Sequence, residues 1–218
     1  MDSPRLTPQI TEMTRLMSER TSREKVQKIR VIACGAIARE ILAIVQANRL
    51  DHIELQCLPA IWHAYPHKIA PGMELAIAAA RAEGIERIFI GYADCGTGGA
   101  LDAICAREGI ERLTGPHCYS FFAGNAAFAG WDDDVTSFFL TDFLARQFES
   151  FVVVPLGLDR HPDLLEAYFG NYKKLVYLCQ QEDPALEEKA RAAAAFLGLE
   201  YEYRFTGYGD LATELIAL

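Results

Sequence analysis

The chain has 218 residues, 51% apolar and 23% charged, so it can bury a sizeable core and is globular rather than disordered. Its formal net charge of -9 argues against a nucleic-acid partner, because binding phosphates requires a basic patch. The sequence shows neither an export signal nor an apolar stretch long enough to span a membrane, so we expect a cytoplasmic protein with no membrane contact. Six cysteines in that compartment are expected to be reduced thiols, metal ligands or core residues.

Residues 1–28 are predicted to form a leading arm or helix, and residues 29–218 a single α/β domain, with a sub-boundary near 135–150 as the alternative. Short apolar runs predict strands at 29–33, 53–58, 87–93, 111–113, 174–179 and 201–205. Helical spacing or stop signals predict helices after 37, over 73–83, from about 100, over 184–197 and from 211. Residues 138–154 begin with apolar residues at helical spacing and continue into the β-branched run Phe151-Val-Val-Val. The alternation predicts a three-layer fold of the Rossmann or flavodoxin type, a mostly parallel sheet of about six strands with helices on both faces.

Three cysteines and a histidine follow the predicted strands at or just beyond their carboxyl ends. They are Cys34, His63, Cys95 and Cys118. If these strands are parallel neighbours, the four side chains meet at the carboxyl edge of one sheet, where open α/β proteins bind their ligands. Thiolate and imidazole together suit zinc, whereas cysteine alone suits an iron–sulfur cluster. For Cys34 alone, a buried core cysteine is an equally good interpretation.

The run that follows the third strand contains a glycine-rich turn around Cys95. Its residues Gly96, Thr97, Gly98 and Gly99 are predicted to hold an anionic group of a ligand through backbone N–H groups, although a merely tight turn is the alternative. The spacing matches neither a P-loop nor a dinucleotide fingerprint. Arg160, in Asp159-Arg160-His161, is a second candidate for binding an anion, against a plain helix-start loop.

The histidines are weaker signals than the cysteines. His63 and His67 are four residues apart, but Pro66 makes one continuous helix unsuitable, so His63 is the candidate and His67 is expected to face solvent. His117 precedes Cys118 and is assigned as an acid/base group or as a partner of a metal ligand; simple hydrogen bonding to the loop is the alternative. Core packing is the interpretation for the other cysteines, Cys57, Cys105 and Cys179.

Seven segments recur in an order typical of one family. They are Ala33-Cys-Gly-Ala, the Trp62-His loop, Gly91-Tyr-Ala-Asp-Cys-Gly, Gly115-Pro-His-Cys-Tyr, Phe139-Leu-Thr-Asp-Phe-Leu-Ala, Leu156-Gly-Leu-Asp-Arg-His-Pro and Tyr168-Phe-Gly-Asn-Tyr-Lys. From Ile29 to Leu218 the chain resembles the family catalogued as domain of unknown function 1638. The resemblance implies the same three cysteines and His63 as the shared site, and a place beside corrinoid-dependent methyltransferases in one-carbon metabolism. The chain departs from many relatives at Pro116-His117, where they have Asp-Asp or His-Asp.

The leading hypothesis is a metal-dependent enzyme that acts on a small-molecule substrate. Cys34, Cys95 and Cys118 would bind zinc, or an iron–sulfur cluster with one open iron, and His63 would be a fourth ligand or an acid/base residue. The resemblance adds corrinoid-linked methyl transfer. The alternative is a non-catalytic accessory protein that carries a metal or corrinoid for a methyltransferase partner. A closed structural zinc ranks last, because the chain has no closely spaced cysteine pair.

Overall fold

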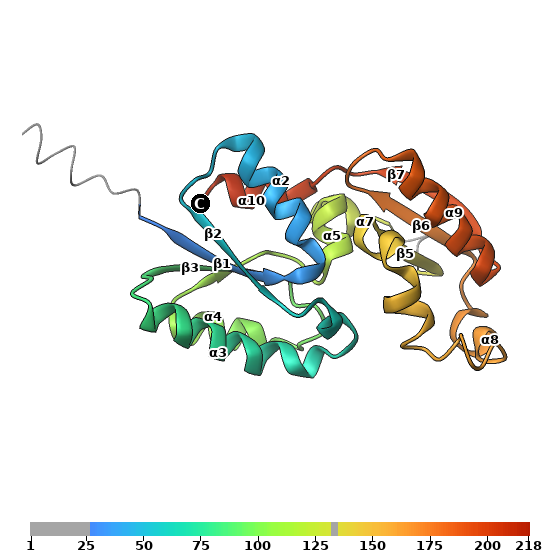
Figure 1. The fold of residues 1–218 in the computed structure, drawn as a ribbon, viewed down its shortest axis with the longest axis horizontal. Helices are drawn as coiled ribbons and strands as arrows, with labels where there is room; N and C mark the ends of the chain where they lie inside the picture. The colour runs from blue at the N-terminus through green and yellow to red at the C-terminus, as the bar shows by residue number, and fades with distance from the viewer. Residues whose placement is uncertain (1–26, 132–134) are drawn as a thin grey trace, which may run out of the picture.

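The chain folds into two α/β lobes that lie side by side, each built on its own parallel sheet (Figure 1). The structure is a computed structural model, and it describes residues 27–131 and 135–218. Nearly all of the arm predicted over 1–28 therefore lies outside the described residues.

The first lobe contains a four-stranded parallel sheet in the order β2-β1-β3-β4. Its strands are β1 (Ile29–Cys34), β2 (Ile53–Leu58), β3 (Arg87–Gly91) and β4 (Glu111–Arg112). The helical segments of this half are the 3-10 turns η1 (Gly35–Ile37), η2 (Ala60–Ala64) and η3 (Pro66–Lys68), and the helices α2 (Ala38–Asn48), α3 (Ile69–Ala82), α4 (Ala100–Glu108), α5 (Cys118–Ala123) and α6 (Asn125–Phe128).

Both faces of this sheet are buried at its centre, which explains why the central strands β1 and β3 are mostly apolar. In β1 the side chains alternate between two cores, so that Val31 packs with α2 and α5 on one face, while Ile32 packs with α3 and α4 on the other. The first lobe is therefore a three-layer sandwich (Figure 1).

The second lobe is a three-stranded parallel sheet in the order β5-β6-β7 with a separate core. Its elements are β5 (Ser137–Thr141), α7 (Asp142–Arg146), a single π-helical turn η5 (Glu149–Val153), α8 (Leu164–Phe169), β6 (Lys174–Cys179), α9 (Pro184–Leu197) and β7 (Glu200–Phe205). Helix α9 begins where the Asp183 carboxylate accepts from the amides of Ala185 and Leu186, and it ends at Gly198, whose φ is 70°.

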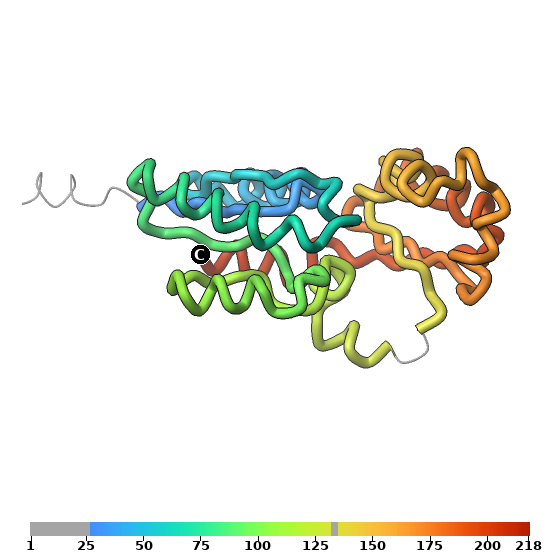
Figure 2. The backbone as a smooth tube through the Cα atoms, turned by 90° about the horizontal axis from the view of Figure 1, so that it is seen from below, coloured from blue at the N-terminus to red at the C-terminus, as the bar shows by residue number. Residues whose placement is uncertain are grey.

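The last helix, α10 (Gly209–Ile216), drawn in red, returns to the first lobe (Figure 2). There Leu211 and Leu215 are fully buried against residues of α2 and α5. Since β7 ends only a few residues before α10, the carboxyl edge of the second sheet faces the first lobe. The C-terminal helix thus ties the two lobes together.

The α/β class with parallel sheets and covering helices is confirmed, but the strands are divided between two sheets. The prediction missed β5, because its short run Ser137 to Thr141 leads directly into a helix capped by the Thr141 hydroxyl. The apolar, β-branched run that follows forms a π-helical turn rather than a strand. The second sheet begins within the range 135–150. No helix in the described part of the chain has the length and apolar character needed to cross a membrane.

Candidate functional site

A cavity of about 110 Å³ lies at the carboxyl edge of the first sheet. Its walls come from the ends of β1 and β3, from the η2 turn and from the first turn of α5. The lining residues are Cys34, Ala36, Ile37, His63, Ile69, Gly91, Tyr92, Cys95, His117, Cys118, Tyr119 and Phe121. The structure therefore brings together the four residues predicted to share a site, and His117 with them.

Cys34 is the last residue of β1 and caps the 3-10 turn that follows it. Its backbone is extended, and its Sγ accepts from the Ala36 amide at 3.4 Å. Burial raises the pKa of the Cys34 thiol, against smaller lowering contributions from the Ala36 amide and the Tyr92 hydroxyl. The side chain is therefore a neutral thiol at neutral pH in the absence of a cation.

Cys95 adopts a backbone conformation that is unusual for a residue with a side chain. Its φ is 50°, in the left-handed region, and its amide donates to the carbonyl of Pro116 at 2.8 Å. This bond joins the loop after β3 to the loop after β4. Burial raises the pKa of the Cys95 thiol to about 12, and the Cys34 thiol contributes next. A non-glycine residue in the left-handed region costs about 1–2 kcal/mol, and such strain is concentrated at functional sites.

Cys118 is the first residue of α5, and the preceding His117 is the helix cap. His117 accepts from the Ser120 amide through Nδ1 at 3.3 Å. The pKa of Cys118 is raised well above its ordinary value by burial, and then by Cys95 and Cys34. The mutual effect agrees with the geometry, because all three cysteines line the same cavity.

The two cavity histidines differ in their structural contacts: His117 caps a helix and packs against an aromatic ring, whereas His63 lies at the exposed rim. The His117 ring packs against Phe128, with ring centroids 5.1 Å apart, and burial lowers its pKa. Because Nδ1 already caps the helix, only Nε2 remains for chemistry, and the predicted acid/base role stays a prediction. His63 lies in η2 on the solvent-facing rim, where partial loss of water lowers its pKa. His67 is exposed as predicted.

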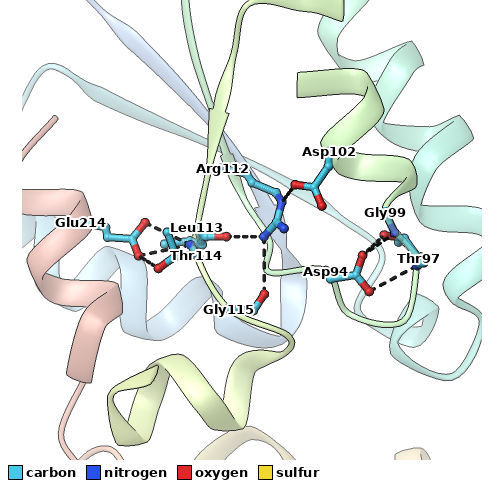
Figure 3. Close-up of polar contacts among 10 residues, drawn as sticks. Asp94, Thr97, Gly99, Asp102, Arg112, Leu113, Thr114, Gly115 and Glu214 are labelled. Atoms are coloured by element: carbon cyan, nitrogen blue, oxygen red, sulfur yellow. Dashed lines mark hydrogen bonds and ion pairs between the residues drawn. The ribbon is translucent and has the colours of Figure 1, made fainter. Parts of the chain in front are cut away.

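The glycine-rich turn after β3 is occupied by a carboxylate of the chain itself (Figure 3). Asp94 accepts from the Thr97 hydroxyl at 2.9 Å and from the amides of Gly98 and Gly99 at 3.2 and 2.8 Å. Burial acts to raise the pKa of Asp94, but these hydrogen bonds outweigh it, so the pKa is lowered overall. An incoming anion would compete with Asp94, and the anion-binding role of Gly96 and the other turn residues stays a prediction.

A second polar network fixes the loop that carries His117 and Cys118 (Figure 3). Arg112 pairs with Asp102 at 2.7 Å and donates to the carbonyls of Leu113 and Gly115 at 2.6 and 3.5 Å. Thr114 is held by Glu214 of α10, with a hydroxyl-to-carboxylate distance of 2.5 Å. The C-terminal helix thereby positions the loop that leads to the cavity.

The remaining predicted residues lie elsewhere. Arg160 belongs to a turn of the second lobe, where its side chain is 70% exposed and faces Asp159 at 3.6 Å. The core prediction holds for Cys179, whereas Cys105 is only partly buried. It is wrong for Cys57, which is exposed because β2 is an edge strand. Sequence reasoning missed Tyr92 as a cavity residue, although its position between the end of β3 and Cys95 was the available signal.

The comparison with protein families decides where the chain belongs. A family model described as "Protein of unknown function (DUF1638)" matches residues 57–215. The chain belongs to this family. The match to DUF1638 includes His63, Cys95 and Cys118 and begins after Cys34, so it is narrower than the resemblance seen in the sequence. Searches of curated proteins and of solved structures gave no match.

The donor set of this DUF1638 cavity fits a thiophilic metal in its chemistry, because three thiols and an imidazole are the ligands that zinc prefers. The side chains are not drawn together to ligand distance: within 27–131 and 135–218, no three His, Cys, Asp or Glu side chains form a group that could hold one ion. Cys34, Cys95, Cys118 and His63 are the residues that would have to move inward around a metal.

Proposed function

We propose that the chain is a metal-dependent enzyme whose metal is held by Cys34, Cys95 and Cys118 at the carboxyl edge of the first sheet. The observation that carries the proposal is the meeting of these three thiols in one cavity with His63 at its rim. They come from the end of β1, the loop after β3 and the start of α5, and none of them forms a disulfide, as expected of a protein in a reducing compartment.

The residues divide into those that would hold the metal and those that would serve the substrate. Three thiolates leave a fourth position open, as in catalytic zinc sites, and His63 either occupies it or moves a proton at the rim. A zinc ion there would supply Lewis-acid activation of a bound ligand. An iron–sulfur cluster with one open iron is the rival, since the same three cysteines would hold it.

The volume of the cavity limits what it can take. About 110 Å³ lies well below the roughly 300–1,000 Å³ of sites for drug-sized ligands, so the cavity holds an ion and a small substrate. A corrinoid ring does not fit inside it. A link to corrinoid-dependent methyl transfer, which rests on the family resemblance, would therefore require the corrinoid to stay on a partner protein and meet the cavity at its mouth.

A non-catalytic accessory protein is the second candidate, and the rim of the cavity favours it. The loop that carries His63 also exposes Ile61 and Tyr65, which are 37% and 41% accessible. Apolar side chains beside a pocket mouth suit contact with a partner protein. The role of Arg160 in docking such a partner stays a prediction.

The proposal is tested by single cysteine substitutions in full-length protein. We expect Cys34→Ala, Cys95→Ala and Cys118→Ala each to lose most of the metal that the wild type retains, with the fold preserved by circular dichroism. Cys105→Ala is the matched control, because this half-buried cysteine of α4 lies outside the lining of the cavity. Full metal content in all three cavity variants would show that the cysteines do not share a metal.

A further inference from the structure

Tyr92 is a buried tyrosine whose hydroxyl makes no hydrogen bond of ordinary geometry within residues 27–131 and 135–218. It follows β3 directly, only 2% of the residue is exposed, and it lines the cysteine cavity. Among the described residues, its hydroxyl oxygen forms no hydrogen bond of ordinary geometry, and its interaction is with the weakly accepting Cys34 thiol. Burying an unpaired hydroxyl costs free energy, and a phenylalanine would fill the same space without that cost. The hydroxyl therefore needs an explanation outside the packing of the core.

The sulfur atoms of the cavity cysteines are the acceptors available to this hydroxyl. Tyr92 lines the same cavity as Cys34, Cys95 and Cys118, and among these thiols its hydroxyl interacts most strongly with that of Cys34. Burial raises the pKa of Tyr92, so the hydroxyl remains a donor at neutral pH. A neutral thiol is a weak acceptor, whereas a thiolate is a strong one, so the donor gains a good partner only when Cys34 is deprotonated.

Other buried tyrosines show that the unpaired state is not general in this chain. Tyr177, which is fully buried in the second lobe, donates to the carboxylate of Asp142 at 2.8 Å. The hydroxyl of Tyr201 is also buried without a hydrogen-bond partner in the described part of the chain, but Tyr201 packs against the core of the second lobe, away from the cysteine cavity. These two residues supply matched controls for Tyr92.

We propose that Tyr92 is a positioning residue, whose hydroxyl donates a hydrogen bond to the Cys34 sulfur when that sulfur is a metal-bound thiolate. This inference rests on the proposed function. The hydrogen bond would orient the thiolate, and it would weaken the donation of charge to the metal because a hydrogen-bond donor draws charge from the sulfur. In the metal-free protein the hydroxyl lacks a good acceptor, and in the metal-bound protein the Cys34 thiolate would supply one.

The test compares Tyr92→Phe, Tyr201→Phe and Tyr177→Phe in full-length protein, using Co²⁺ alone as the probe. In metal-free protein we expect Tyr92→Phe and Tyr201→Phe to leave Tm unchanged or raised. Tyr177→Phe should lower Tm by roughly 3–6 °C, because it breaks a bond to a buried carboxylate. In Co²⁺ titrations, only Tyr92→Phe should weaken binding, by about 10-fold or more, and shift the thiolate-to-cobalt absorption band to longer wavelength.

The outcomes separate this inference from the proposed function. If wild-type protein shows no thiolate-to-cobalt band, the cavity cysteines do not bind a divalent metal, and the role of Tyr92 at such a metal is overturned. If the wild type and Tyr92→Phe give the same band and affinity, the metal site stands and the role of Tyr92 is overturned. A drop in Tm for metal-free Tyr92→Phe as large as that for Tyr177→Phe also overturns it, because the hydroxyl would then have a structural partner.

Discussion

The left-handed backbone at Cys95 leads to a prediction whose sign is unusual. At an ordinary position, alanine is more stable than glycine, because glycine adds roughly 0.5–1 kcal/mol of flexibility to the unfolded chain. At a φ of 50°, any side chain adds a strain of about 1–2 kcal/mol that glycine avoids. The strain exceeds the flexibility term, so we expect Cys95→Gly to be more stable than Cys95→Ala by about 0.5–1 kcal/mol.

The comparison removes the thiol from both variants, so loss of the sulfur cannot cause the difference. Thermal unfolding of the metal-free variants should place Tm of Cys95→Gly about 1–4 °C above that of Cys95→Ala in a chain of this size. The same pair at Cys105, inside α4, is the control, and there alanine should be more stable by about 1 kcal/mol. If alanine is the more stable residue at both positions, the backbone at Cys95 is not strained, and its conformation does not support a functional role for this residue.

Three further predictions concern residues around the site. The pKa of Glu40 is raised by burial first and then by Asp142. The contribution of Glu40 to folding stability is therefore complete below its unfolded pKa near 4.5, and it is lost as the pH rises through the raised pKa of the folded state. In urea titrations, Glu40→Gln should gain stability relative to wild type as the pH rises from 4.5 to 7, and a difference that does not change with pH would contradict this. Asp94→Asn should lower the free energy of unfolding by about 1 kcal/mol, because it weakens the cap of the glycine turn; an unchanged urea midpoint would show that the cap contributes nothing. Gly72→Ala should lower Tm despite its better helix propensity, because a Cβ there would lie 2.2 Å from the Trp62 ring beside the rim loop; a raised Tm would show that Trp62 moves freely.

Much of the first lobe follows from local sequence. The central strand β1 is mostly apolar because both of its faces are covered, whereas the edge strand β2 alternates apolar and polar residues. Both patterns are typical of strands, so β1 and β2 were predicted almost residue for residue. Helix α9 was predicted equally well, because Asp183 and Gly198 mark its two ends chemically. The meeting of Cys34, Cys95 and Cys118 followed from a single rule, that parallel strands present their carboxyl ends at one edge.

What the sequence did not yield depends on contacts between distant segments. Strand β5 was not predicted, because Leu140 and Leu144 fit the spacing of one helix as well as they fit a strand followed by a helix. The return of α10 to the first lobe is encoded in the packing of Leu211 and Leu215, which no local pattern reports. Asp94 as the occupant of the glycine turn requires knowing which way its carboxylate faces.

The central claim, a metal held by the three cavity cysteines, is tested most directly by elemental analysis and visible absorption of untagged wild-type protein purified without oxygen. The account predicts about one zinc per chain and no colour, or iron with inorganic sulfide and a brown spectrum if the rival cluster is correct. Protein that retains neither metal, and that takes up neither when supplied with zinc or with iron and sulfide, would contradict it.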